Sequence, residues 1–211
     1  MTWIDVAALG VVGVLGGWFW RDYRRKRLEK RRKFIETYTF PERVRRKVLT
    51  TYPHLKEEDA DTVIEGLRHY FVIALLAEGK MVSMPSQAVD VAWHEFLLFT
   101  KAYERFCHKA FGRFFHHHPA EAMKGPKTAQ EGIRRTWRIA CKIEGINPDA
   151  PQKLPLLFMI DGMLNIPDGF TYALNCDSPF QTKKDHVYCA SHIGCGGGAC
   201  GGGCGGGCGG A

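Results

Sequence analysis

The sequence predicts a mainly helical protein with a single amino-terminal transmembrane helix, a cytosolic domain of four or five helices and a disordered tail. Three observations carry this prediction: a nearly unbroken apolar run at the start, helical spacing of apolar residues through the middle, and a tail built almost only of glycine and cysteine. The expected segments are a transmembrane helix over 1–20, a basic juxtamembrane segment over 21–33, a helical domain over 34–165, a loop-rich segment over 166–193 and a low-complexity tail over 194–211.

The apolar run over residues 3–20 contains a single charged side chain, Asp5. As a helix it would span about 27 Å, which is just enough to cross the hydrocarbon core of a bilayer. Trp3 lies at one end of the run and Trp18 and Trp20 lie at the other, and tryptophan favours the headgroup level. A cleaved signal peptide would need positive charge before the run and small residues after it, and the sequence has neither. We therefore expect a retained transmembrane helix.

The segment that follows, residues 21–33, holds nine basic and two acidic residues, whereas the rest of the chain holds 20 of each. Because Lys and Arg beside a transmembrane helix stay in the cytoplasm, we expect a cell-membrane protein with its amino terminus outside and its domain cytoplasmic. The basic side chains would contact anionic lipid headgroups, and no nucleic acid is expected as a partner. Gly10, Gly13 and Gly17 share one helical face, which favours self-association.

The middle of the chain shows the helical period. Helices are expected over 41–51 and over 56–77 with Gly79 at its end. A third helical segment, one helix or a bent pair, is expected to start near Pro85 or Ser86, to carry apolar residues as far as Phe111 and to stop by Pro119. A fourth is expected from Thr128, where Glu131 completes a capping box, to Gly145. Beyond residue 147 the prolines predict loops with one short helix or a strand pair. Alternating Val, Ile and Thr are scarce, so a sheet-based domain is not expected.

The candidate site lies in the third of these helical segments. Asp90 and His94 are four residues apart, so they face the same way from one helix, and His116 and His117 follow the next helix. Two or three imidazoles with one carboxylate would suit zinc or non-haem iron. Glu95 lies about a quarter-turn away and would act as a base only if the helix were turned favourably. The alternative is that His94 is a core histidine and the His run a helix end.

Cysteines supply two further candidate sites. Cys176, Cys189, His192 and Cys195 could close a tetrahedral zinc site, or they could be incidental residues of a loop. The tail cysteines Cys200, Cys204 and Cys208 repeat every four residues between glycines, so they could capture a soft metal ion, form disulfides, serve as a substrate for modification or belong to a low-complexity extension. Cys107 and Cys141 are expected to be reduced core residues.

Three motifs resemble a known family. Val-Asp-Val-Ala-Trp93-His94-Glu-Phe-Leu-Leu-Phe-Thr, Tyr103-x-x-Phe106-Cys107 and Gly112-Arg-Phe-Phe-His116-His117-x-Pro119, together with the Gly/Cys-rich tail, resemble the bacterial relatives of glycine-rich domain-containing proteins. The resemblance covers roughly residues 80–120. It implies no defined activity, but it favours Trp93, His94, His116 and His117 over the other histidines and leaves His118 in a variable position.

No nucleotide-binding loop, nucleophile elbow or His-Glu-x-x-His pattern is present, so the sequence reveals no reaction. The expected function is therefore a membrane-anchored helical module that binds a metal, such as zinc, or a partner. The alternatives are a metal-dependent enzyme with His94 and His116 or His117 as ligands, and a scaffold in which these residues only hold helices together.

Overall fold

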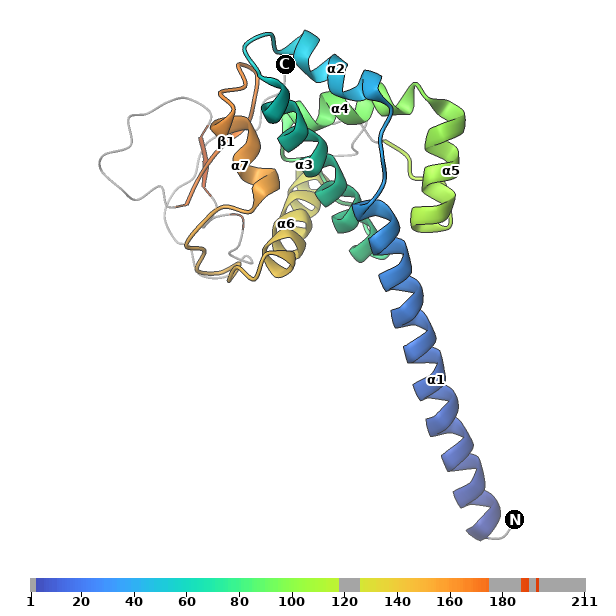
Figure 1. Ribbon diagram of the computed structural model, residues 1–211. Helices are drawn as coiled ribbons and strands as arrows, with labels where there is room; N and C mark the ends of the chain where they lie inside the picture. The colour runs from blue at the N-terminus through green and yellow to red at the C-terminus, as the bar shows by residue number, and fades with distance from the viewer. Residues whose placement is uncertain (1–2, 118–125, 175–186, 190–192, 194–211) are drawn as a thin grey trace.

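The computed structural model describes residues 3–117, 126–174, 187–189 and 193, and this part of the chain is mainly helical (Figure 1). The helices are α1 (Trp3–Glu36), α2 (Glu42–Thr51), α3 (Glu57–Leu76), α4 (Gln87–Leu97), α5 (Thr100–Phe111), α6 (Pro126–Ile143) and α7 (Leu156–Met163), and the strands are β1 (Thr171–Ala173) and β2 (Val187–Cys189). Helices α2 and α3 agree with the predicted bounds to within one residue. The segment expected between Ser86 and Pro119 as one helix or a bent pair consists of two helices, α4 and α5, whereas α6 begins at Pro126 rather than at Thr128.

Helix α1 runs without a break from Trp3 to Glu36, and it projects away from the other helices with the amino terminus at its far end (Figure 1). The predicted transmembrane helix is wrong, because no helix in the described part of the chain is long and apolar enough to cross a membrane. The apolar start does not end as a separate helix at residue 20 but continues into the basic residues 21–33. The predicted localisation as a single-pass cell-membrane protein, with its amino terminus outside and its domain in the cytoplasm, is contradicted by the same finding.

The carboxyl-terminal turns of α1 join the packed part of the molecule. Ile35 is fully buried, and the Phe34 ring lies 5.7 Å, centroid to centroid, from Phe106 on α5. At the centre of this half of the core lies Phe71 on α3, whose ring centroid is 4.8 Å from that of Phe106 and 6.0 Å from that of Trp93 on α4. Aromatic packing of this kind buries a large apolar area with defined geometry, so it fixes α4 and α5 relative to α3.

The second half of the core lies between α3, α6 and α7. Trp137 on α6 packs edge-on against Phe158 on α7 at 5.0 Å, and its indole Nε1 donates to the carbonyl of Pro148. Gly66 on α3 allows α7 to come close, because an added Cβ would meet the side chain of Ile160. Helix α7 is thereby brought to the start of α4.

A buried carboxylate fastens α7 to α4. Asp161 is only 3% exposed, and its two oxygens accept from the Ser86 hydroxyl at 2.6 Å and from the backbone nitrogens of Gln87 at 2.7 Å, Ala88 at 3.3 Å and Phe170 at 2.9 Å. Ser86 itself caps α4 by accepting from the Val89 nitrogen. A carboxylate at a helix amino terminus satisfies unpaired N–H groups and favours the helix dipole. The direction in which α4 leaves its cap is therefore fixed.

The segment after α7 contains a small parallel sheet. Strands β1 and β2 pair with Thr171 opposite Val187, Tyr172 opposite Tyr188 and Ala173 opposite Cys189. The Tyr172 ring packs on Phe158 of α7 at 4.9 Å, which attaches this sheet to the helical core. The sequence left a helix or a strand pair open here, and the structure has both α7 and the pair.

Candidate metal centre

The first two side chains of the site come from one face of α4. Asp90 and His94 are one turn apart, and His94 Nδ1 lies 3.2 Å from Asp90 Oδ2. This proximity follows from the spacing of four residues, which places side chains directly above one another on a helix. The Asp161 cap at the start of α4 holds this face outward from the core.

The third side chain arrives because the chain reverses after α5. Gly112 ends α5 in the left-handed conformation at φ 75°, where glycine is favoured because it has no Cβ, and its nitrogen donates to the carbonyls of Cys107 and His108. The segment 113–117 then runs back towards α4. Within it Phe115 and His117 are half-buried, whereas Phe114 and His116 are exposed.

A short hydrogen-bonded chain holds the returning segment in place. The Trp93 Nε1 donates to the Tyr103 hydroxyl at 3.2 Å, and that hydroxyl donates to the Phe115 carbonyl at 2.5 Å. Burial raises the pKa of Tyr103, so its phenol stays protonated and can keep donating. The Phe115 ring stacks on Trp93 at 5.4 Å. The backbone two residues before His117 is therefore anchored to α4 and α5.

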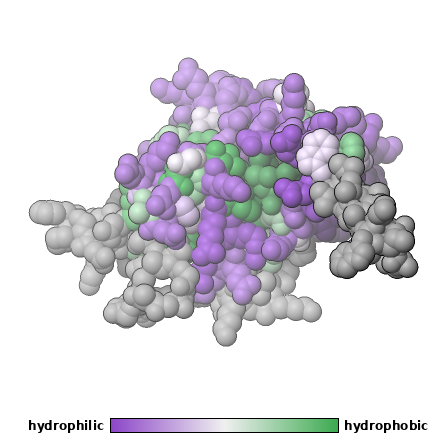
Figure 2. Space-filling model, turned by 90° about the horizontal axis from the view of Figure 1, so that it is seen from below, coloured by the Kyte–Doolittle hydropathy of each residue, from purple (hydrophilic) through white to green (hydrophobic). Residues whose placement is uncertain are grey.

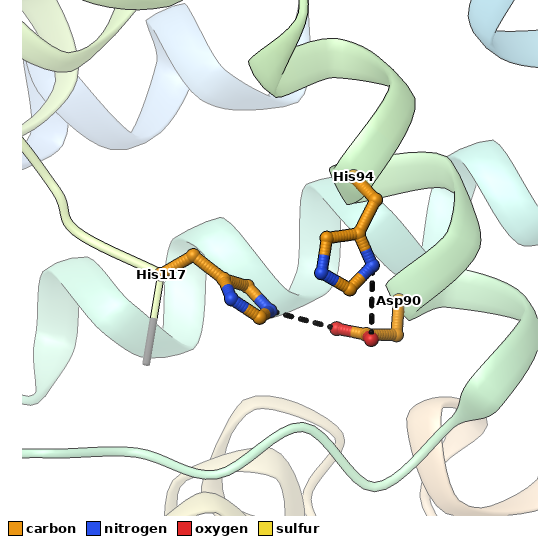
Figure 3. A group of neighbouring side chains, drawn as sticks. All are labelled: Asp90, His94 and His117. Carbon is orange, nitrogen blue, oxygen red and sulfur yellow. Dashed lines mark hydrogen bonds and ion pairs between the residues drawn. The ribbon is translucent and has the colours of Figure 1, made fainter. Parts of the chain in front are cut away.

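His117 completes the cluster. Its Nε2 lies 3.2 Å from Asp90 Oδ1, so the two oxygens of one carboxylate face two different imidazoles (Figure 3). The His117 ring also packs edge-on against Trp93 at 4.5 Å, and its centroid lies 4.3 Å from that of His94. The indole thus forms the apolar wall of the site, and the histidine pair forms its polar mouth.

The spacing of these three side chains suits a metal ion. One ligand atom from each of Asp90, His94 and His117 lies within 4.8 Å of the other two. Two ligands bound at about 2.0–2.2 Å to one zinc ion lie roughly 3.0–3.6 Å apart, and both carboxylate–imidazole distances are 3.2 Å. The His117 side chain is 14% exposed, that of Asp90 21% and that of His94 52%, so one side of the cluster faces solvent.

Metal binding by these residues requires a proton on each coordinating imidazole nitrogen to move to the other ring nitrogen or to solvent. In the metal-free arrangement an imidazole N–H can donate to each Asp90 oxygen. Coordination requires the lone pair of that nitrogen, so the N–H must move to the other ring nitrogen or leave. Asp90, which already lies against both rings, would then partly neutralise the positive charge of the ion.

Two of the expected residues lie outside this cluster. The exposed His116 has its ring against Phe114, at 4.8 Å between centroids, and is not part of the group that could hold a metal. Glu95 is 5% exposed, and its Oε1 pairs with Arg43 Nε of α2 at 2.6 Å. Glu95 therefore links α4 to α2 and does not serve the site as a base. His118 lies outside the described residues.

The cysteine sites are mostly beyond the described part of the chain. Cys176, His192, Cys195, Cys200, Cys204 and Cys208 all lie outside the described residues. Cys189 ends β2 and is disulfide-bonded. Since a zinc ligand must be a free thiolate, Cys189 in this state would not bind zinc, in contrast to the expected reduced site. Cys107 and Cys141 are buried and carry free thiols, as expected of core residues.

Sequence reasoning missed how the site is supported. Trp93 and Tyr103 were noticed only as motif residues, although they position His117 through Phe115. The partners of Asp161, which orients α4, do not follow from the sequence, because Ser86 is far away along the chain and the other donors are backbone groups. A charged residue inside the otherwise apolar stretch Leu156–Met163 was the available sign.

Together these features define a mainly helical protein with a half-buried cluster of one carboxylate and two imidazoles. The chain belongs to the UCP032817-like family, whose model matches residues 30–193 and so includes the whole cluster. No curated protein and no solved structure matches it. The resemblance to glycine-rich domain-containing proteins is therefore wrong. It rested on short motifs over residues 80–120, and those motifs are explained by local packing around Trp93 and the turn at Gly112.

Proposed function

We propose that this protein binds one divalent transition-metal ion, with zinc as the first candidate, through Asp90, His94 and His117. The observation that carries the proposal is the convergence of these three side chains from α4 and from the segment after α5 to within 4.8 Å. A carboxylate with two imidazoles is a donor set that suits zinc and non-haem iron. The Trp93 ring supports it, because an apolar wall strengthens the attraction between the ion and the carboxylate.

A metal-dependent enzyme is the second candidate, and one observation favours it. Three protein ligands leave coordination positions open, and the 52% exposure of the His94 side chain places those positions towards solvent. A metal with open positions supplies Lewis-acid chemistry and an activated water. Asp90, His94 and His117 would bind and orient the ion, and Trp93 would exclude water from one side. The substrate would be small enough to reach a shallow site.

The scaffold alternative rests on the same contacts. Asp90 bridges two imidazoles and so ties the segment 113–117 to α4 without any ion. In that case replacing His94 would affect only stability. A metal site and a scaffold therefore differ in whether the three residues control metal content.

The test is the zinc affinity of the full-length chain and of His94→Ala, His117→Ala and Asp90→Asn. His116→Ala is the matched control, because His116 is adjacent to His117 but exposed and outside the cluster. Accessible thiols are first blocked with iodoacetamide without reductant, so that cysteines do not contribute. We expect one ion per wild-type or His116→Ala chain, and at least a tenfold loss of affinity in the other three. Equal affinity in His94→Ala and His116→Ala would remove the proposal.

Acidity provides an independent readout of the ligand type. Imidazole must be neutral to coordinate, so zinc affinity is expected to rise as the pH rises through about 6–7 and then to level off. Cobalt should give a spectrum without the intense thiolate charge-transfer band in the near ultraviolet. An affinity that is constant between about pH 5.5 and 7.5 would count against imidazole ligands.

A further inference from the structure

A cleft lies where α1 crosses the ends of α3 and α5. Its floor is apolar and is formed by Leu28, Ala74, Leu75 and Phe111. Its rim carries the guanidinium groups of Arg21, Arg24, Arg25, Arg27, Arg31 and Arg113. Figure 2 views the molecule from the side on which α1 projects, and there hydrophobic side chains gather in the middle of a mostly hydrophilic surface. The cleft thus combines a basic rim with an apolar floor.

Two of these arginines lie against glycine residues at helix ends. The Arg113 guanidinium lies over Gly79 just past α3, and the Arg31 guanidinium lies over Gly112 at the end of α5, so an added Cβ at either glycine would meet it. Helix carboxyl ends carry partial negative charge, which stabilises a cation placed there. Burial and the neighbouring Arg27 lower the pKa of Arg31. The structure therefore gathers positive charge here against its own repulsion.

The carboxylates of this region neutralise only part of that charge. Asp22 pairs with Lys26 at 2.8 Å and with Arg25 at 3.3 Å, and Glu78 pairs with Arg24 at 3.4 Å. Within the described ranges, Arg21, Arg27, Arg31 and Arg113 form no ion pair with a carboxylate. Four guanidinium groups are therefore available to an anionic ligand.

Exposed aromatic side chains continue the cleft along α1. Trp18 and Trp20 line it and are 61% and 63% exposed, and Phe19 and Tyr23 are also more than half exposed. Tryptophan and tyrosine favour the headgroup level of a bilayer, where the ring meets apolar carbon and its polar edge meets water. Basic residues directly beside them are attracted to anionic lipid. Along α1 the aromatic residues come first and the basic residues follow, so the rings and the positive charges could contact the headgroup region side by side.

We propose that this cleft binds the phosphate of an anionic phospholipid headgroup, which holds α1 at a bilayer surface. Arg27, Arg31 and Arg113 would contact the phosphate, the apolar floor would cover the glycerol region, and Trp18 and Trp20 would lie at headgroup depth. This is binding at a surface and involves no helix that crosses the bilayer. Nucleic acid fits less well, because three of the exposed aromatic residues, Trp18, Phe19 and Trp20, form one run before the basic residues instead of alternating with them.

The test is flotation of the full-length protein with vesicles of phosphatidylcholine alone or of equal parts phosphatidylcholine and phosphatidylglycerol. The variant R27Q/R31Q/R113Q removes three charges from the cleft. The control R46Q/K47Q/K101Q removes three exposed charges from α2 and α5. We expect the cleft variant to bind the anionic vesicles about 100-fold more weakly than the control. Circular dichroism of both variants checks that the helices are retained.

The other outcomes identify what the cleft does instead. Equal vesicle binding by the two triple variants, or equal binding of wild type to the two vesicle types, would overturn the proposal. So would tight binding of a short single-stranded RNA that is lost in the cleft variant while vesicle binding is absent. A Trp18→Ala/Trp20→Ala variant should lose the part of vesicle binding that survives high salt, because salt screens the arginines but not apolar contact. Unchanged binding in that variant at high salt would contradict the placement of the two rings.

Discussion

The first helix and the packed domain differ in the balance of basic and acidic residues and in how their charged side chains are paired. Helix α1 gathers nine basic residues against two acidic ones over 21–33, and most of them are exposed. The rest of the chain carries equal numbers of basic and acidic residues, and where it buries a carboxylate it also supplies partners. Asp161 accepts four hydrogen bonds, and Glu95 pairs with Arg43. The buried carboxylates of the domain are therefore paired within the fold, whereas Arg21, Arg27 and Arg31 on α1 form no ion pair with a carboxylate in the described part of the chain.

Asp90 lies between these two extremes, and this position makes it the residue of interest. It is neither fully buried nor free, and both of its oxygens face imidazoles that can release protons. A buried carboxylate with fixed N–H donors holds a fold, and an exposed one is screened by water. A half-buried carboxylate beside two imidazoles can give up its contacts with the two rings and bind a metal ion together with them.

The largest effect is expected from the buried carboxylate. Asp161→Ala leaves the Ser86 hydroxyl and three backbone N–H groups without their acceptor, so the free energy of unfolding should fall by about 3–5 kcal/mol. Urea denaturation measures it. Asp149→Ala, at an exposed carboxylate, is the control and should stay within about 0.5 kcal/mol of wild type. Similar losses in the two variants would show that Asp161 does not hold α7 to α4.

The buried thiols of Cys107 and Cys141 should react more slowly than a thiol on the protein surface. Burial raises the pKa of the Cys141 thiol to about 11 and also raises that of Cys107, so at pH 8 both thiols are less ionised than an exposed cysteine is. We expect both to react with iodoacetamide roughly 100-fold more slowly than an exposed cysteine introduced as Lys101→Cys. Peptide-resolved mass spectrometry gives the rates. Both thiols should become as reactive as the control in guanidinium, and fast reaction of the native thiols would contradict their burial.

A smaller effect is expected at Tyr103, which positions His117 without touching an ion. Tyr103→Phe removes the hydroxyl that holds the Phe115 carbonyl, so zinc affinity should fall about tenfold. Tyr70→Phe is the control, because it removes another buried hydroxyl, bonded to Val82, that does not hold the segment 113–117. The two variants should lose comparable stability but differ in zinc affinity. If they bind zinc equally, the segment is held by packing alone.

The smallest effect concerns self-association through Gly10, Gly13 and Gly17, which stays a prediction. Gly13→Leu would widen the closest approach of two α1 helices, so the dimerisation constant should weaken a few-fold. Val11→Leu places the same leucine side chain on another face of the helix and should leave association unchanged. Sedimentation velocity of both variants measures it. Equal association in the two would remove the glycine face as an interface.

Much of the helical framework followed from the sequence because apolar spacing and end signals are local. The 3.6-residue period and Gly79 placed α3, and Ser86 placed the start of α4. The transmembrane prediction is wrong, because the apolar run continues into the basic residues as one helix to Glu36 and no helix in the described residues is long and apolar enough to cross a membrane. Hydropathy of a segment does not say where its helix ends.

The site was predictable in part. The pairing of Asp90 with His94 follows from helical geometry, whereas the choice between His116 and His117 does not. In the extended segment 113–117 every second side chain faces the core, so either Phe114 and His116 or Phe115 and His117 could do so. Because both 114 and 115 are phenylalanine, the sequence does not say which of the two pairs is the inward one. The Tyr103 hydroxyl settles it by binding the Phe115 carbonyl, a contact between side chain and backbone that no residue pattern encodes.

The most direct test of the metal centre is anomalous diffraction from a zinc-soaked crystal of the full-length protein at neutral pH. We expect an anomalous peak about 2.0–2.2 Å from one Asp90 oxygen, one His94 nitrogen and one His117 nitrogen, with the Trp93 ring beside it. A well-ordered cluster in which Asp90 still bonds both imidazoles, with no peak between them, would contradict it. That result would leave these residues as a device that ties the segment 113–117 to α4.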